Sequence, residues 1–422
     1  MRIGIDRIGT YIPAEVLPAE VLADARDIPV GKLKQGLGVH AMAVVPPWED
    51  TVSLAANAAL RALGDAVSVE EIGLCIVGTE SGVDHSKPAA IFVHELLGLP
   101  PNCRTYEVKH ACFGGTAALL TAMDWIASGS ARGRKALVIA SDIAKYPPGS
   151  AGEPTQGAGA VALVVSEDPA LVEMDRSSTG VFAGQVHDFW RPLDQTQAIV
   201  DGKYSVDCYL EALDHAFADY ARQQEGRDDA DKPLSDRFAR LVFHAPFPRM
   251  ASKAHARMVV ADWKAHAARS AELPDDLTDL VERDAQARVD PTLWANQLIG
   301  NTYTASMYFG LAGLLEREAT ELEGKLLGFF SYGSGCCSEF FAGRVVAGAS
   351  RIAEEIGLGE MIDRRKEVSM AEYERHHAKP DLRAMENPEK PGSHFSGPIY
   401  FSGTTDEKRT YAARERGASF VR

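Results

Sequence analysis

Short apolar runs alternate with amphipathic stretches along most of the chain. The first half predicts strands at 73–81, 135–141 and 157–166, with helices around AAIFVHELLG and after Cys112. The second half predicts strands at 239–247, 325–335 and 338–346, with helices around ASKAHARMVVADWKAH and after GNTYTAS (300–306). Continuous apolar runs between helices indicate mainly parallel strands buried on both faces. Because both halves repeat the same order, we expect a duplicated α/β core with an active site between the halves.

The remaining segments are more polar and predict peripheral structure. Residues 223–236 predict an exposed loop, and the acidic residues 271–292 predict a helical excursion on the surface. Residues 359–397 predict a peripheral helix followed by an extended loop, with His376 and His377 on the solvated surface. PIYFSG (398–403) predicts a last strand that pairs with the main body.

Composition narrows the classes of protein. The chain has 422 residues, of which 45% are hydrophobic, and it contains neither an apolar run of membrane-spanning length nor a secretory signal pattern. We therefore expect a soluble, cytoplasmic protein. The net charge of −15 argues against nucleic acid as a partner, since phosphate binding needs a basic surface. The six cysteines lack CxxC spacing, and no group of residues has the spacing of a metal site.

The stretch around Cys112 carries the strongest chemical signal. Cys112 stands where a short apolar strand gives way to a long helix, and Gly114 and Gly115 let a ligand approach the backbone closely. A helix N-terminus lowers the pKa of a thiol, so we expect a reactive thiolate that attacks a carbonyl. The alternative is a buried, inert structural cysteine.

Two further residues follow apolar strands directly. Glu80 ends the run LCIVGT, where partial burial raises the pKa of a carboxyl group and suits it to proton transfer. His244 follows ARLVF, where an imidazole can donate a hydrogen bond to a substrate carbonyl. A solvated glutamate and a core histidine are the alternatives, but the combination with Cys112 favours a catalytic group.

Several other positions are suited to binding a substrate. Asn301 opens a helix and can cap it or orient a catalytic group, and Ser334 lies in a glycine turn that ends a strand. Arg249 and Lys253 share one helical face just beyond His244 and can bind the phosphates of a pantetheine carrier. A solvated surface is the alternative for this pair of cations.

Together these motifs resemble those of the 3-hydroxy-3-methylglutaryl (HMG) synthase family of the thiolase superfamily. The resemblance runs from GIDRIGTYIPAEV to DEKRTYAARE, and so covers nearly the whole chain. GTESGVDHSKPA is similar to the family's glutamate segment, HACFGGTAAL to its nucleophile segment and FHAPFPRMASKA to its histidine segment. GEPTQGAGAVAL, HDFWRP, VDGKYS, GNTYTAS and FSYGSG also resemble family blocks, in the correct order.

The resemblance implies an α/β fold with a duplicated thiolase-like βαβαβαββ core, layered α/β/α/β/α. Its two halves would be residues 1–170, with Cys112 and Glu80, and residues 171–422, with His244 and Asn301. The family's nucleophile, acid/base and substrate-carbonyl partner carry over onto Cys112, Glu80 and His244. Its positions that contact substrate or pantetheine fall on Thr155, Ser205, Arg249, Lys253, Asn301 and Ser334. Arg249 stands where the family often has lysine, which keeps the charge but changes the geometry.

The resemblance also implies an acyltransferase that joins an acetyl group on Cys112 to a β-ketoacyl thioester, with no metal or redox cofactor. One branch of the family makes HMG-CoA, and the other acts on acyl carrier proteins in polyketide β-branching. VKHACFGG, SYGSGCCSEFFAG and SGPIYFSGTTDEKRTYAAR are similar to the polyketide branch, whereas GEPTQGAGAVAL and VDGKYSVDCYLEALD are similar to the HMG-CoA branch.

We favour the polyketide branch at this stage, with donor and acceptor acyl carrier proteins as partners and a homodimer as the assembly. The alternative is an HMG-CoA synthase of the mevalonate pathway, with acetyl-CoA and acetoacetyl-CoA as partners. The acidic net charge counts mildly against carrier proteins, which are acidic themselves.

Two other functions remain open from the residues. A ketoacyl synthase III-like enzyme uses cysteine, histidine and asparagine, which Asn301 allows, but that chemistry needs no carboxylate base such as Glu80. A catalytically silent scaffold that binds carrier proteins would not need Cys112, Glu80 and His244 together. An acetyl adduct on Cys112 would separate an enzyme from a scaffold.

Overall fold

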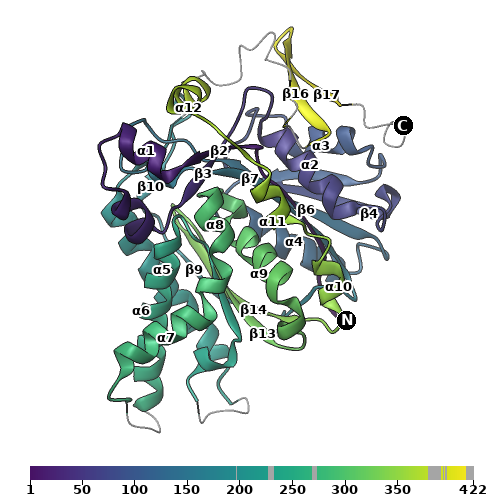
Figure 1. The fold of residues 1–422 in the computed structure, drawn as a ribbon. Coiled ribbons are helices and arrows are strands. Elements are labelled where there is room, and N and C mark those ends of the chain that lie inside the picture. Colours follow the sequence, from purple (N-terminus) through teal and green to yellow (C-terminus); the bar gives the residue numbers. More distant parts are fainter. Residues whose placement is uncertain are drawn as a thin grey trace.

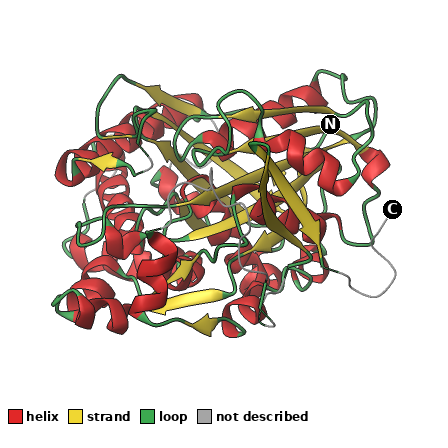
Figure 2. Ribbon diagram, turned by 90° about the horizontal axis from the view of Figure 1, so that it is seen from above, coloured by secondary structure: helices red, strands yellow, loops and turns green. Residues whose placement is uncertain are grey.

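The computed structural model describes residues 1–195, 197–226, 232–268, 273–378, 391–392, 394 and 397–414. Helices enclose a central β-sheet from several sides (Figures 1 and 2). In these ranges no helix combines the length and apolar character required to cross a membrane.

The first half of the sheet has the spatial order β1-β7-β6-β4-β5. These strands are β1 (Ile3–Tyr11), β4 (Ile72–Gly78), β5 (Arg104–Val108), β6 (Lys135–Ile143) and β7 (Ala158–Glu167). Successive side chains of a strand point to opposite faces, so Leu74 and Ile76 enter one hydrophobic cluster while Cys75 and Val77 enter another. β4 is thus buried on both faces, as its continuous apolar run predicts.

The second half of the sheet continues from β1 through β8. Its strands are β8 (Val172–Met174), β9 (Gly180–Ala183), β12 (Arg240–Phe243), β13 (Leu326–Gly333) and β14 (Cys337–Val345). β8 pairs antiparallel with both β1 and β14, which joins the two halves into one ten-stranded sheet.

The prediction of mainly parallel strands is wrong. Within the described sheet, β4 is parallel to β5 and β6, and β12 is parallel to β13, whereas the other pairs are antiparallel. A strand buried on both faces has a continuous apolar sequence in either direction, so composition alone does not reveal its orientation. The parallel pairs are nonetheless those that end beside the candidate site residues.

Five layers result from the packing of helices on the two halves. α4 (Gly114–Ala127) and α9 (Ser306–Leu322) share one cluster with both halves of the sheet and so lie between them. α2 (Thr51–Leu63) and α3 (Ala89–Leu97) cover the outer face of the first half. α5 (Gly202–Gln223) and α6 (Pro248–Ala267) cover the outer face of the second half. The predicted α/β/α/β/α layering is confirmed.

Smaller elements complete the described chain. They are β2 (Glu15–Pro18), α1 (Ala19–Ala25), β3 (Ala41–Val44), β10 (Phe189–Trp190), β11 (Ile199–Val200), α7 (Leu277–Arg288), α8 (Trp294–Ile299), α10 (Ala349–Ala353), α11 (Leu358–Asp363), β15 (Lys366–Glu367), α12 (Met370–His377), β16 (Ile399–Thr405) and β17 (Lys408–Ala413). α7 lies where the helical excursion was predicted, and parts of the predicted loops at 223–236 and 359–397 lie outside the described residues. The division at residues 170 and 171 stays a prediction.

The C-terminal strand does not join the main sheet as predicted. β16 pairs only with β17 in the described chain, and the resulting hairpin sits on α2. The Asn57 side chain of α2 donates to the Ile399 carbonyl at 2.8 Å and accepts from the Ile399 amide at 3.0 Å. This amide side chain takes the place that a neighbouring strand would occupy.

His376 and His377 are not on the solvated surface. His376 is buried, and its Nδ1 lies 3.2 Å from Oε2 of Glu15, while Nε2 of His377 lies 3.0 Å from Oε1 of Gln156. The polar partners come from segments more than 200 residues away in sequence, so the local charged composition around α12 gave the wrong environment.

Candidate active site

A cavity of about 450 Å³ lies where the two halves of the sheet meet. Its walls are mostly aromatic and small polar side chains. The lining includes Cys112, Tyr146, Thr155, Phe189, Ser205, Tyr209, His244, Asn301, Tyr303, Tyr332 and Ser334. Most of the residues singled out in the sequence therefore meet in one place, although they come from segments almost 200 residues apart.

The backbone around Cys112 is held in an unusual conformation. Ala111 has a φ of 40°, a region that non-glycine residues enter at a cost of roughly 1–3 kcal/mol. The helix α4 then starts at Gly114, against which Gly78 packs so closely that a Cβ on Gly78 would lie 2.5 Å from the Gly114 carbonyl carbon. This close packing of β4 on α4 brings the strand end that carries Glu80 next to Cys112.

The thiol of Cys112 donates a hydrogen bond to Oε1 of Glu80 at 3.2 Å. Burial, together with the nearby charge of Glu80, raises the pKa of Cys112 well above its usual value. The expectation that the helix N-terminus lowers this pKa is therefore wrong for the resting site. A buried carboxylate in direct contact outweighs the partial charge of a helix end.

Burial raises the pKa of Glu80 to about 8, and the charge of Asp142 adds to the effect. Arg191 opposes it, because its Nη2 donates to the Glu80 carbonyl at 2.9 Å and lies 3.4 Å from Oε2. The side chain of Glu80 is only 6% exposed. A carboxyl group with this pKa exchanges protons near neutral pH, as the sequence analysis expected of Glu80.

Asp142 organises the turn that carries Glu80. Its Oδ1 accepts from the amides of Glu80 and Ser81, each at 2.9 Å, and from the Thr79 hydroxyl at 2.8 Å. Its Oδ2 accepts from the Thr304 amide at 3.1 Å and from the Thr304 hydroxyl. This buried carboxylate at the end of β6 thereby ties the Glu80 turn to the segment that precedes α9.

Sequence reasoning missed both Asp142 and Arg191. Asp142 follows an apolar strand in the same way as Glu80 does, so the same signal was present at SDIA. Arg191 lies in the HDFWRP block, which the resemblance marked without assigning a role.

His244 is buried immediately after β12. Its amide donates to the Phe330 carbonyl at 2.7 Å, and its carbonyl accepts from the Tyr209 hydroxyl at 2.7 Å. Burial lowers the pKa of the imidazole to about 3, so the ring is neutral at physiological pH. A neutral imidazole presents one donor and one acceptor, which suits contact with a carbonyl oxygen.

Four of the six predicted binding residues line the cavity: Thr155, Ser205, Asn301 and Ser334. The Asn301 side chain accepts from the Tyr303 amide at 2.9 Å, and the Asn301 amide donates to the Thr155 carbonyl at 2.9 Å. Asn301 thus shapes the turn before α9 and does not cap the helix itself.

The glycine turn around Ser334 is fixed by Asp188, which sequence reasoning also missed. Its carboxylate accepts from the Tyr332 hydroxyl at 2.6 Å and from the Gly335 amide at 3.0 Å. Asp188 is fully buried and lies in the same block as Arg191.

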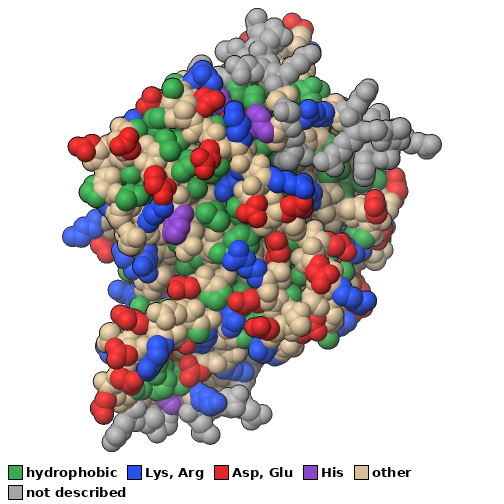
Figure 3. Space-filling view, viewed as in Figure 1, with side chains coloured by type: hydrophobic (Ala, Val, Ile, Leu, Met, Phe, Trp, Pro, Cys, Tyr) green, Lys and Arg blue, Asp and Glu red, His purple; other side chains and the backbone are tan. Residues whose placement is uncertain are grey.

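Arg249 and Lys253 are exposed on α6 and do not line the cavity. Nε of Arg249 donates to the Gln35 carbonyl at 3.0 Å, and Nζ of Lys253 lies 5.9 Å from the Phe247 ring, which is itself part of the cavity wall. Both cations therefore flank the opening. Acidic and basic side chains are interspersed on the face shown in Figure 3, so the net negative charge does not gather into one patch there.

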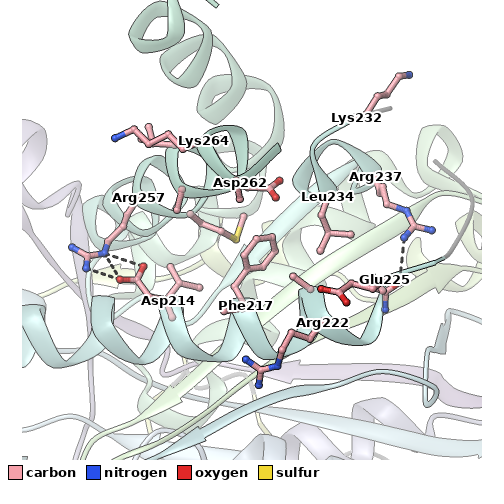
Figure 4. Close-up of a pocket in the computed structure, with 18 of the residues that line it drawn as sticks. Asp214, Phe217, Arg222, Glu225, Lys232, Leu234, Arg237, Arg257, Asp262 and Lys264 are labelled. Carbon is pink, nitrogen blue, oxygen red and sulfur yellow. Dashed lines mark hydrogen bonds and ion pairs between the residues drawn. The ribbon is translucent and has the colours of Figure 1, made fainter. Parts of the chain in front are cut away.

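A larger hollow of about 1070 Å³ lies elsewhere, between α5 and α6 (Figure 4). The figure shows Asp214 of α5 paired with Arg257 of α6 along its rim, with Nη2 to Oδ2 separated by 2.5 Å. Its described lining contains no cysteine, histidine, serine, threonine or tyrosine, so it offers neither a nucleophile nor a group that titrates near neutral pH. We therefore place the chemistry in the smaller cavity.

Comparisons with known proteins agree with this location. The family described as "Hydroxymethylglutaryl-coenzyme A synthase N terminal" matches residues 1–170, and its C-terminal counterpart matches residues 172–285 and 272–414. The hydroxymethylglutaryl-CoA synthase of Enterococcus faecalis is 37% identical over 375 residues, covering 89% of this chain and 91% of that protein.

Two further relatives represent the two branches. The polyketide biosynthesis 3-hydroxy-3-methylglutaryl-ACP synthase PksG of Bacillus subtilis (strain 168) is 34% identical over 386 residues, covering 88% of this chain and 87% of that protein. The solved structure of MvaS in complex with 3-hydroxy-3-methylglutaryl coenzyme A is 42% identical, with a TM-score of 0.92 and coverage of 98% and 99% of the two chains.

Proposed function

Because this chain belongs to the hydroxymethylglutaryl synthase family, an acyltransferase family with a thiolase-like fold, we propose that it makes HMG-CoA from acetyl-CoA and acetoacetyl-CoA. The observation that carries the proposal is the contact of 3.2 Å between the Cys112 thiol and the Glu80 carboxyl group, at a cavity that His244 also lines. A nucleophile and a proton carrier in contact are what a condensation through a covalent acyl-enzyme needs.

In the first step the sulfur of Cys112 attacks the carbonyl carbon of acetyl-CoA. The thiol proton leaves through Glu80, its hydrogen-bond partner, and CoA departs as the protonated thiol. The product is an acetyl thioester on Cys112. Since the pKa values of both Cys112 and Glu80 are raised, deprotonation of the pair is the costly part of this step.

In the second step ionised Glu80 removes a proton from the acetyl methyl group. The electron pair of that C–H bond forms the new bond to the ketone carbon of acetoacetyl-CoA, and the ketone oxygen becomes an alkoxide. Glu80 then returns its proton to this alkoxide. Neutral His244 donates a hydrogen bond to the acceptor carbonyl, and its low pKa keeps it from competing for the proton.

In the third step water hydrolyses the thioester and frees Cys112. Thr155, Ser205, Asn301 and Ser334 line the space around the substrate, and Arg249 with Lys253 at the opening binds the phosphates of CoA. The cations keep their distance from the reacting atoms, so they contribute to binding and not to chemistry.

The choice of CoA over a carrier protein departs from the sequence analysis, which favoured the polyketide branch. Its support is the greater similarity to the Enterococcus faecalis synthase and to the MvaS complex than to PksG. The motifs around Cys112 and Cys336 keep a carrier-protein substrate as the second candidate. The assembly as a homodimer stays a prediction.

One experiment separates the two candidates. Acetyl-CoA and an acetylated acyl carrier protein are offered in parallel, and acetylation of Cys112 is followed by mass spectrometry. We expect acetyl-CoA to load the enzyme at least as fast as the carrier protein at equal concentration, and acetoacetyl-CoA to complete turnover. Loading from the carrier protein alone would reject the HMG-CoA reading and favour the polyketide branch.

A further inference from the structure

Tyr303 has a backbone conformation that costs free energy. Its φ of 45° lies in the left-handed region, where a bulky residue is strained by roughly 1–3 kcal/mol. The turn before α9 holds it there, since the Tyr303 amide donates to the Asn301 side chain at 2.9 Å and the neighbouring Thr304 is bonded to Asp142. The strain is therefore built into the same framework that carries Glu80.

The side chain of Tyr303 has a second cost. It is 1% exposed, and its hydroxyl is a buried polar atom without a hydrogen-bond partner in the described part of the chain. The Tyr146 phenol is close enough to interact with it electrostatically, but no hydrogen bond of normal geometry joins the two hydroxyls. Buried hydroxyls almost always find a partner, so this one needs an explanation.

Packing alone does not provide that explanation. The Tyr303 ring meets Phe189 edge-on, with centroids 5.7 Å apart, and both belong to a small cluster that Cys112 touches. A phenylalanine would fill the same volume without burying an unpaired hydroxyl. Strain and an unpaired polar group at one residue that lines the Cys112 cavity point to a partner that arrives with the substrate.

The neighbouring charges indicate which substrate atom this is. The phenol lies within electrostatic reach of Glu80, Arg191 and Cys112, and burial together with these groups raises its pKa well above its usual value. Tyr303 therefore keeps its proton and acts as a hydrogen-bond donor. An acetyl group on Cys112 would occupy the space beside this ring.

We propose that Tyr303 is a further catalytic residue, whose hydroxyl donates a hydrogen bond to the carbonyl oxygen of the acetyl group on Cys112 while Glu80 removes the methyl proton. The electron pair of the broken C–H bond moves into the new C=C bond, and negative charge collects on this oxygen. The phenol stabilises that charge without giving up its proton. The inference rests on the proposed function and adds a residue to its second step.

The test measures loading and enolisation separately in Tyr303→Phe. Acetylation of Cys112 is followed by mass spectrometry with acetyl-CoA, and exchange of the acetyl methyl hydrogens is followed in D2O without an acceptor. We expect loading within about threefold of the wild type and exchange slower by about 100-fold, the usual effect of removing one donor to an oxyanion. The Tm should stay level or rise, because an unpaired buried hydroxyl is lost.

Tyr308→Phe is the matched control. It also removes a buried phenol hydroxyl from the α9 region, but this hydroxyl lies 2.9 Å from Oγ1 of Thr116 and outside the cavity lining. We expect a lower Tm and exchange at the wild-type rate. Exchange at the wild-type rate in acetylated Tyr303→Phe, or equal losses of loading and exchange, would overturn the assignment. A wild-type enzyme that cannot be acetylated would reject the proposed function itself.

Discussion

The Cys112 thiol donates a hydrogen bond to Oε1 of Glu80 at 3.2 Å, which makes nucleophile and acid/base a single coupled unit. Burial raises the pKa of both groups, and each charge raises the pKa of the other. The resting site therefore holds its protons tightly. Loss of the Glu80 carboxylate would make the Cys112 thiolate easier to form.

The first prediction concerns the pH dependence of condensation. Glu80 must be ionised to remove a methyl proton, and its pKa is about 8, so the rate from pre-acetylated enzyme should rise with pH and be half-maximal near pH 8. Arg191 lowers this pKa, so Arg191→Gln should move the midpoint to higher pH. Rapid-quench measurements from pH 6 to about pH 10 follow both.

Arg222→Gln serves as the control, since Arg222 is an exposed arginine paired with Asp219, far from Glu80. Its profile should match the wild type. A midpoint that stays in place or falls in Arg191→Gln would contradict the role of Arg191.

The second prediction concerns stability. The pKa of Glu80 is about 8 in the folded protein and 4.5 in the reference state, so folding favours the protonated acid. The stability linked to this group is complete below the unfolded pKa and is lost as pH rises towards the folded pKa. Glu80→Gln cannot ionise, so it should gain stability relative to the wild type between pH 5 and pH 9, by a few kcal/mol. Urea unfolding at both pH values measures it, and a constant difference would refute the burial of the charge.

The third prediction concerns Asp142. Asp142→Asn replaces one acceptor oxygen by an NH2 group that faces either the donors of Thr304 or those of the Glu80 turn. We expect a loss of about 2–3 kcal/mol in unfolding free energy and a condensation rate that falls more than loading does. Asp168→Asn is the control, because Asp168 forms an exposed pair with Arg2 and should change stability by less than about 1 kcal/mol. Wild-type condensation in Asp142→Asn would contradict its positioning role.

The fourth prediction concerns the cations at the cavity opening. Alanine at both Arg249 and Lys253 should raise KM for acetyl-CoA and leave kcat largely intact, since both side chains are exposed and lie outside the cavity wall. The effect should shrink as ionic strength rises. A truncated donor without phosphates should react equally with both enzymes, and equal losses for both donors would place these residues in the chemistry or the fold.

The sequence predicted the reacting residues because each one follows an apolar strand directly. Glu80 and His244 end strands β4 and β12, and Cys112 stands between β5 and α4. In a sheet of this kind such positions converge, so residue type and location were enough. The resemblance then gave the layered fold, which the structure bears out.

The supporting residues could not be predicted in the same way. Asp142 and Arg191 act through contacts with Glu80 that span 62 and 111 residues, and no local pattern reveals such contacts. The same limit explains the error at His376, whose partner Glu15 lies at the other end of the chain. The thiol pKa was misjudged for this reason too, because the contact with Glu80 decides it.

The most direct test of the account compares wild type, Cys112→Ala and Glu80→Ala with acetyl-CoA and then acetoacetyl-CoA. Mass spectrometry follows acetylation at Cys112, and product analysis follows HMG-CoA. We expect the wild type to load and turn over, Cys112→Ala to do neither, and Glu80→Ala to accumulate acetyl-enzyme without forming the new carbon–carbon bond. HMG-CoA production by Cys112→Ala, or condensation by Glu80→Ala near the wild-type rate, would contradict it.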